Sequence, residues 1–337
     1  QKFDNNGIFI TKWGTEGNSD GQFFNPSGIG INKDENVYVV DDYSYQIFDR
    51  NGTFLRKVDW GFWSPYGGEI AIDLDNNIFI TDNMGGGHLK KYTNDEDVPS
   101  IQWNSPGNTT KLWNPNGITI NTLGNILIVD SHGNRIFKLD NTGNILAEYG
   151  IEGSDGNFIS PMGIALDLEG NVYVTDRYNH RIQKFDNNGN FLIKWGSFGT
   201  GDGMFWDPSA IAVDNMGNVY VKDSMLPRIQ KFDSNGKFLD KWYTPGSDNH
   251  GIYSVFPVPL GITVDNTGNV FFADFRNNSI QKIDSNGTFL IKWGSPGTNN
   301  GEFDDIFDIA ADKYGNIYVA DEGNRRIQKF DNQGQFL

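Results

Sequence analysis

Histidines are the residues of this chain that could most readily hold a catalytic metal ion, because imidazole nitrogens are common ligands of zinc. The chain has four of them, at His88, His132, His180 and His250. The first three follow strands that are predicted to be equivalent, so they could share one rim of the fold. A zinc site would need them to converge on one ion at about 2 Å. His180 occupies an ordinary turn position, so we keep His88, His132 and His180 only as weak metal candidates and predict no cofactor.

Acidic and basic residues recur five positions apart, and such pairs could do general acid–base chemistry. The pairs are Asp130 with Arg135, Asp176 with Arg181, Asp223 with Arg228, and Asp321 with Arg326. A catalytic pair would occur once, whereas copies in equivalent places indicate a repeated structural contact. We interpret the pairs as links across a turn, each of modest energy if it is exposed.

The elements that position these residues are short strands that end in aspartate. Each aspartate follows the previous one by 41 to 51 residues, and four strands are predicted in each interval, which is typical of β-propeller blades. Turns of the patterns D-x-x-G-N and D-x-x-G join the strands into antiparallel hairpins. The aspartates are Asp41, Asp82, Asp130, Asp176, Asp223, Asp274 and Asp321. The chain is therefore predicted to be an all-β, seven-bladed β-propeller of four-stranded antiparallel blades.

The repeat as a whole resembles a known family. Its pattern P-x-G-I-A-V-D, G-N-V-Y-V-T-D and N-H-R-I-Q-K-F-D is similar to the NHL repeat, and residues 179–182 carry the letters N-H-R-I. The resemblance covers the whole chain and implies a binding module attached to other domains. NHL-like propellers also include zinc-dependent lyases that amidate peptides and lyases that open cyclic peptide antibiotics. The resemblance therefore keeps a metal-dependent lyase or hydrolase, with a site at the channel mouth, as the alternative.

The third strand of the repeat occurs once more often than a ring needs, with copies at 1–4 and 327–331. We expect one domain over residues 1–337, in which residues 1–14 complete the last blade formed by residues 303–337. Pairing of the N- and C-terminal strands would then close the ring. The spare strand could instead join a neighbouring molecule in a head-to-tail assembly. Because Gln1 begins inside a repeat, we expect an excised domain or a processed chain.

Charge and composition narrow the partners and the location. The chain carries 43 acidic and 27 basic residues and a net charge of −16, which disfavours nucleic acid. No apolar run approaches the roughly 20 residues that cross a membrane, and without cysteine there is no thiolate metal site. N-x-S/T sequons stand in predicted turns or loops at Asn51, Asn108, Asn277 and Asn286. Together these features favour an extracellular or cell-surface protein.

Breaks in the repetition mark the candidate binding residues, because repeat proteins carry function on variable connections. Aromatic side chains there suit stacking against peptides or sugars, and polar residues at the channel mouth would add hydrogen bonds. The candidates are Trp63, Tyr66, Trp113, Asn116, Arg177, Trp206, Asp207, Tyr253 and Phe256. We predict a non-catalytic binding or scaffold propeller with a protein, peptide or glycan ligand, and self-association through the terminal strands as an alternative.

Overall fold

The computed structural model describes residues 13–59, 68–82, 87–93, 98–103, 112–150, 156–226, 228–243, 261–265, 267–274, 277–286, 288–312, 314–331 and 333–334. The chain divides into two compact units. Unit 1 comprises residues 1–84, 90–102 and 259–337, and unit 2 comprises residues 85–89 and 103–258. Over the described residues, no helix is both long and apolar enough to cross a membrane.

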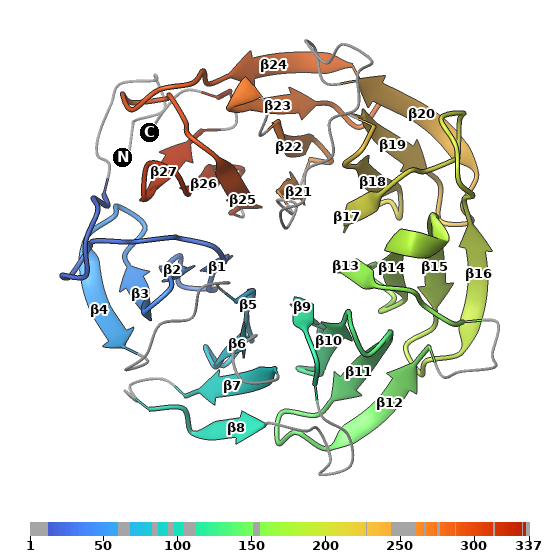
Figure 1. Ribbon diagram of the computed structural model, residues 1–337, viewed down its shortest axis with the longest axis horizontal. Helices are drawn as coiled ribbons and strands as arrows, with labels where there is room; N and C mark the ends of the chain where they lie inside the picture. The colour runs from blue at the N-terminus through green and yellow to red at the C-terminus, as the bar shows by residue number, and fades with distance from the viewer. Residues whose placement is uncertain are drawn as a thin grey trace. The chain divides into compact units, whose positions relative to one another are not determined.

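Unit 2 contains three four-stranded sheets, each an antiparallel meander in chain order (Figure 1). The first has β9 (Pro115–Ile120), β10 (Ile126–Asp130), β11 (Arg135–Leu139) and β12 (Ile145–Tyr149). The second has β13 (Pro161–Leu166), β14 (Val172–Asp176), β15 (Arg181–Phe185) and β16 (Phe191–Trp195), with the short 3-10 helix η2 (Arg177–Asn179) between β14 and β15. The third has β17 (Pro208–Val213), β18 (Val219–Asp223), β19 (Arg228–Phe232) and β20 (Phe238–Tyr243).

The remaining sheets repeat this meander. One has β1 (Ile29–Ile31), β2 (Val37–Val40), β3 (Ser44–Phe48) and β4 (Phe54–Asp59). The next has β5 (Ile70–Ile72), β6 (Ile78–Asp82), β7 (His88–Tyr92) and β8 (Ile101–Trp103). Two more are β21 (Ile262–Val264), β22 (Val270–Asp274), β23 (Ser279–Ile283) and β24 (Phe289–Trp293), and β25 (Ile306–Ala311), β26 (Ile317–Asp321) and β27 (Arg326–Phe330). The chain is thus a seven-bladed β-propeller of antiparallel blades, as its sequence predicts.

The turn between the first two strands of a blade explains its D-x-x-G-N pattern. The carboxylate of Asp214 accepts hydrogen bonds from the backbone N–H of Met216 at 2.9 Å and of Asn218 at 2.8 Å, and from the Asn218 side chain at 2.8 Å. Gly217 has φ 79°, a left-handed conformation that glycine adopts without strain. The aspartate therefore replaces the missing strand partners of the turn amides, and no calcium ion is needed to explain the pattern.

Neighbouring blades are joined by a repeated aromatic contact. The indole of Trp195, at the end of β16, lies 5.8 Å from the ring of Phe232 in β19. A Cβ atom at Gly236 would come within 2.6 Å of that indole, so the glycine of this turn makes room for the tryptophan. Trp293 and Phe330 repeat the contact at 5.6 Å. Outer-strand aromatic residues therefore pack between neighbouring blades in both units.

Buried lysines on the third strands make a second contact between blades. Lys184 lies over the ring of Tyr173 at 4.8 Å, and its ammonium donates a hydrogen bond to the backbone oxygen of Ser234 in the next blade at 3.2 Å. Lys138 reaches Asn187 in the same way at 2.6 Å. These lysines are structural, because their charges are bound inside the fold and do not face a ligand.

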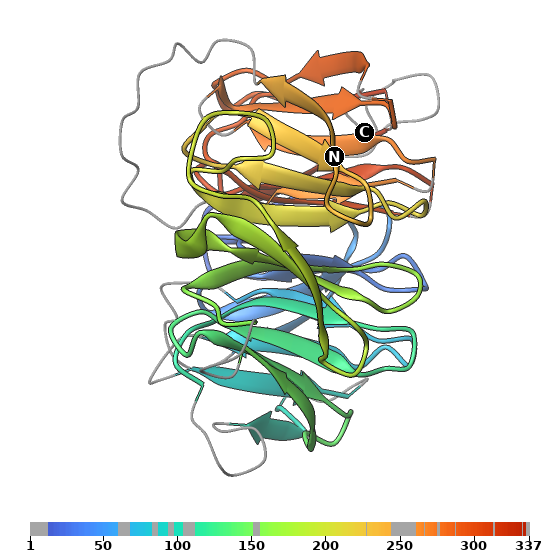
Figure 2. The ribbon, with the colours of Figure 1, turned by 90° about the vertical axis from the view of Figure 1, so that its right-hand side faces the viewer.

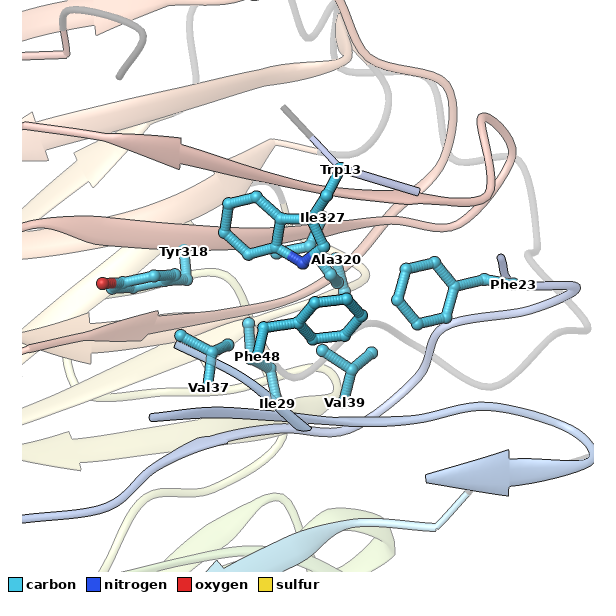
Figure 3. Close-up of a cluster of buried hydrophobic side chains, with 9 residues drawn as sticks. All are labelled: Trp13, Phe23, Ile29, Val37, Val39, Phe48, Tyr318, Ala320 and Ile327. Atoms are coloured by element: carbon cyan, nitrogen blue, oxygen red, sulfur yellow. The ribbon is translucent and has the colours of Figure 1, made fainter. Parts of the chain in front are cut away.

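The N-terminal segment meets the last sheet at Trp13. This residue forms an antiparallel bridge with Ile327 of β27, and its indole lies 5.7 Å from the ring of Phe48. Figure 3 shows Trp13 and Phe48 in one buried cluster with Phe23, Ile29, Val37, Val39, Tyr318, Ala320 and Ile327. Residues 1–12, on which the expected completion of the last blade depends, lie outside the described residues.

Candidate protein-binding surface

In the three blades of unit 2, the aspartate that ends the second strand holds the connection leading into the first strand of its own blade. The carboxylate of Asp223 accepts hydrogen bonds from the backbone N–H groups of Trp206 at 3.0 Å and Asp207 at 2.8 Å. Asp176 does the same for Ile159 at 2.8 Å, and Asp130 for Trp113 at 3.0 Å. Each aspartate therefore fixes the backbone of the connection on the rim of its blade.

The paired arginines complete this frame. The guanidinium of Arg181 donates to Asp176 at 2.7 Å, and Arg326 donates to Asp321 at 2.6 Å. The geometry agrees with the interpretation of these pairs as structural links. The sequence alone allowed exposed pairs, but both aspartate side chains are fully buried. Burial is the largest influence on Asp321, and it raises the pKa of that carboxyl against the opposing effects of the Asp304 N–H and the Arg326 charge.

The frame displays an apolar side chain at the same place in all three blades of unit 2. Trp113, Ile159 and Trp206 each lie next to their blade's aspartate and remain 65%, 48% and 38% exposed. The register of the first two strands shows that these positions are equivalent. Large apolar side chains exposed in a row are unusual on a soluble surface, and they mark an interaction site more often than isolated ones do.

Aromatic residues from a turn and a connection extend this row. His180 follows η2 with φ 54°, and its Nδ1 lies 2.7 Å from the backbone oxygen of Trp206. The His180 ring packs against Phe198 at 4.9 Å, and Phe198 packs against Trp206 at 5.3 Å. Phe198 and the neighbouring Tyr178 are both exposed. We call Trp113, Ile159, Tyr178, Phe198 and Trp206 the aromatic rim of unit 2.

An ion pair supports the aromatic rim from inside. The guanidinium of Arg177, in η2, donates to the carboxylate of Asp207 at 2.9 Å and lies 5.1 Å from the ring of Tyr178. Burial opposes the charge of Arg177, but the hydrogen bonds and the charge of Asp207 outweigh it and raise the pKa of the guanidinium. The pair thus joins two blades, and each of these charges is already satisfied by the other.

The structure brings three of the predicted binding residues, Arg177, Trp206 and Asp207, together, and Trp113 occupies the position equivalent to Trp206 two blades away. Trp113 and Trp206 belong to the aromatic rim, and Arg177 and Asp207 support it. Asn116 is separate, because its side chain donates to the hydroxyl of Ser131 at 2.9 Å. The other candidates, Trp63, Tyr66, Tyr253 and Phe256, lie outside the described residues. Sequence reasoning missed Ile159, Tyr178 and Phe198, although Ile159 could have been found by aligning it with Trp113 and Trp206.

The histidines are dispersed over different elements. His88 begins β7, His132 is exposed in the turn after β10, and His180 is engaged by Trp206 and Phe198. In the described part of the chain, no group of three or more His, Cys, Asp or Glu side chains could hold a metal ion.

The sequons differ in how accessible they are. The side-chain amide of Asn277 donates to the carboxylate of Asp274 at 2.8 Å, and that of Asn51 points to Asp49 at 3.4 Å. Asn286 is exposed in the turn before β24. Asn108 lies outside the described residues. A glycan on Asn277 would replace one hydrogen of an amide that binds a buried carboxylate, whereas the side chain of Asn286 is exposed.

Comparison with known proteins agrees with this architecture. The NHL repeat model matches residues 112–139 and 158–185. The protein brain tumor of Drosophila melanogaster is 28% identical over 151 residues, which is 42% of this chain but 14% of that protein.

Among solved structures, a virginiamycin B lyase from Staphylococcus aureus is similar with a TM-score of 0.71 and 18% identity, covering 91% of this chain and 95% of that one. A streptogramin B lyase is similar with a TM-score of 0.73 and 20% identity, covering 96% and 97%. At such low identity these likenesses establish the fold alone.

Proposed function

Because the chain belongs to the NHL-repeat family of β-propellers, we propose that it is a non-catalytic binding module and that the aromatic rim of unit 2 binds a peptide segment of a partner protein. The observation that carries the proposal is the row of Trp113, Ile159 and Trp206, held by equivalent buried aspartates on consecutive blades. The frame is rigid while the side chains it presents are exposed. Such pre-organised aromatic residues are typical anchors of protein interfaces.

The exposed rings are not required by the fold. In unit 1, Asp304 occupies the place of Trp206, and its N–H donates to Asp321 at 2.8 Å in the same manner. Pro296 occupies the place of Phe198 and makes the same bridge to the following buried phenylalanine. Since polar or small residues satisfy the same frame, the aromatic residues of unit 2 are best explained by what they contact in a partner.

Selection from a random peptide library, followed by fluorescence anisotropy with the best peptide, tests this proposal. We expect the double variant Phe198→Ser with Trp206→Ser to raise the Kd at least about tenfold, because two central aromatic anchors are lost. The matched control is Leu146→Ser in β12, which removes an exposed apolar side chain from the same unit. Equal binding by the double variant and the wild type, or equal loss in the control, would contradict the proposal.

A metal-dependent lyase or hydrolase is the competing proposal. It would need ligands beyond His132 and His180, because a catalytic zinc site takes about three protein ligands. Metal analysis of the purified protein discriminates between the two. Stoichiometric zinc that disappears in His132→Ala would favour the enzyme, whereas zinc below stoichiometry would favour the binding module.

Head-to-tail assembly through the terminal strands is a further alternative. Within one chain, Trp13 already bridges Ile327 at the edge of β27, and this contact would have to open for a second molecule to pair there. Light scattering over a range of concentrations tests the idea. A monomer at the highest concentration would remove it.

An extracellular or cell-surface location remains part of the proposal, supported by the acidic charge and by the exposed sequon at Asn286. In a secreting host we expect a glycan at Asn286 that Asn286→Gln removes. Mass spectrometry of the intact protein, before and after glycosidase treatment, measures this. Secretion without any glycan on Asn286 would remove the support that this sequon gives.

A further inference from the structure

Unit 2 exposes a second set of apolar side chains, at the other end of its first strands from the aromatic rim. These residues lie in the turns β9–β10, β13–β14 and β17–β18, and they are Leu123, Leu168 and Met216, with exposed fractions of 74%, 67% and 74%. In Figure 2, η2 lies at one end of its sheet and the hairpin turns lie at the other. We call Leu123, Leu168 and Met216 the aliphatic rim.

The turns do not need these apolar residues. In the turn of Leu123, the side chain of Asn121 accepts the N–H of Leu123 at 3.0 Å and of Asn125 at 2.9 Å. In unit 1, Asn32 accepts the N–H of Asp34 in the same way at 3.0 Å. Asp265 does so for Thr267 at 2.9 Å. Polar residues therefore make the same turn, so the exposed apolar residues need an explanation other than folding.

The three residues belong to neighbouring turns. Strand β13 packs against β9 on one side and β17 on the other, as the order of these strands in Figure 1 shows. The turn that follows β9 is also tied to the next blade, because the Asn121 amide lies 3.4 Å from the Asn187 side-chain oxygen. Leu123, Leu168 and Met216 thus lie in a strip of three neighbouring turns, one on each blade.

Negative charge surrounds this strip. Glu169 is exposed beside Leu168, and Asp140 and Asp186 stand in the adjoining turns of the same end. Burial opposes ionisation of Asp140, but hydrogen bonds from Asn144 and Thr142 lower its pKa to about 2. Two lysines lie nearby and both are buried. Lys138 donates to Asn187 at 2.6 Å and its charge acts on Asp186, and Lys184 pairs with Asp167 at 3.8 Å, so they offset only part of the charge of these turns.

We propose that the aliphatic rim is a second docking surface and that its occupant is a cationic amphipathic segment of a partner protein. The apolar side chains of that segment would cover Leu123, Leu168 and Met216, and its Lys or Arg residues would face the surrounding carboxylates. The interface does not involve the aromatic rim. The two surfaces at opposite ends of the same strands would let the propeller hold two partners at once.

The test uses the full chain and a fluorescein-labelled amphipathic peptide of about four helical turns, built from Leu and Lys. The variant is Leu123→Thr, Leu168→Asn and Met216→Thr, which installs the residue types that Thr267 and Asn215 place in equivalent turns. We expect the Kd of the peptide to rise at least about tenfold in this triple variant. The matched control, Leu55→Asn in β4, removes an exposed leucine of unit 1 that lies outside these turns and should leave the Kd unchanged. Unchanged denaturant midpoints would show that both variants fold.

Two further peptides separate charge from apolar contact. One replaces Leu by Ser at the same charge, and the other replaces Lys by Glu at the same apolarity; both should bind at least about tenfold more weakly. Equal binding of all three peptides, or unchanged binding by the triple variant, would overturn the proposal. Two other results would also overturn the proposal. If sedimentation shows that the wild type self-associates and the triple variant does not, the occupant is a second copy of the chain. If the wild type binds phosphatidylcholine–phosphatidylglycerol vesicles and the triple variant does not, the occupant is a lipid surface. The Phe198 and Trp206 variant should bind the Leu–Lys peptide normally, so the two surfaces fail independently.

Discussion

Residues 196–206 of unit 2 and residues 294–304 of unit 1 are two copies of one connection built for different surfaces. Gly203 and Gly301 have φ 73° and 74°, and each donates its N–H to a glutamine side chain at 2.9 and 3.0 Å. Phe205 and Phe303 are fully buried in both. The backbone and its inner contacts are therefore the same in both units.

The outward positions of the two connections differ. Where unit 2 has Phe198, Met204 and Trp206, unit 1 has Pro296, Glu302 and Asp304. Side chains that hold the frame have no freedom to change, because each satisfies buried polar groups. Outward side chains make few such contacts, Glu302 with the N–H of Asn299 at 2.9 Å being one, so they can differ from blade to blade. The comparison teaches that function in this chain is to be sought where equivalent positions disagree.

Removal of the frame should have the largest effect and should be alike in both units. Arg228 donates to the backbone oxygens of Thr200 and Met204, both at 2.7 Å, and Arg326 donates to those of Thr298 and Glu302 at 2.8 and 2.6 Å. We expect Arg228→Met and Arg326→Met each to lower the free energy of unfolding by about 3–5 kcal/mol. Each variant leaves a buried carboxylate without its counter-charge and at least two carbonyls without a donor, and Arg326 also serves the oxygen of Asn299. Urea denaturation measures this, and a large difference between the two variants would contradict the equivalence.

The second prediction concerns the residue that follows the aspartate at the end of the second strand of a blade. This residue is Arg177 in one blade of unit 2 and Glu322 in one blade of unit 1. Burial, and then the charges of Asp305 and Asp42, raise the pKa of Glu322 from 4.5 to about 7. The unfolded chain therefore ionises this group first, and the stability from Glu322 falls as the pH rises from about 4.5 to 7. We expect Glu322→Gln to raise the free energy of unfolding by about 2 kcal/mol at pH 8, less than the pKa shift alone would give because the side chain is partly exposed. At pH 4 the substitution should leave the free energy of unfolding unchanged.

Unfolding curves of the wild type and Glu322→Gln across this pH range provide the measurement. The control is Arg177→Gln, which should destabilise the protein at both pH values because Asp207 loses its partner. A stability difference for Glu322→Gln that does not depend on pH would refute the assigned cause.

The third prediction concerns the glycines of the two connections. Because Gly203 and Gly301 share a left-handed conformation, alanine at either place should cost about 1–2 kcal/mol from backbone strain. Thermal unfolding of Gly203→Ala and Gly301→Ala should show equal losses. Gly201→Ala serves as the control, since Gly201 lacks this conformation. Unequal losses would mean that the two connections are not copies.

The smallest effect on stability should come from exchanging the surfaces. Phe198→Pro, Met204→Glu and Trp206→Asp together give residues 196–206 the outward residues of unit 1. We expect the free energy of unfolding to change by about 1 kcal/mol or less, because these side chains are exposed. Binding of a library-selected peptide should nevertheless be lost, and a stability loss as large as that of Arg228→Met would show that the aromatic residues hold the frame.

Particular residues show how far sequence reasoning reached. The recurring Asp–Arg spacing predicted the links seen at Asp176 with Arg181, because identical residues at identical spacing must serve the same local geometry. Burial of those links was missed, since exposure depends on the neighbouring connection. Trp113 and Trp206 were found as aromatic breaks in the repeat, while Phe198 was missed because a single aromatic residue beside glycine carries no sign of its exposure.

The sequence by itself determined the strands, their turns and the propeller. The alternation of side chains along a strand, the turn glycines and the aspartates at the ends of the second strands act over a few residues, and they recur in every blade. Only the tertiary structure decided which residues share a surface. Arg177 and Asp207 stand 30 residues apart and form one ion pair between blades, and His180 meets Trp206 across the same boundary. Such contacts depend on how one blade packs against the next, and no local pattern encodes that distance.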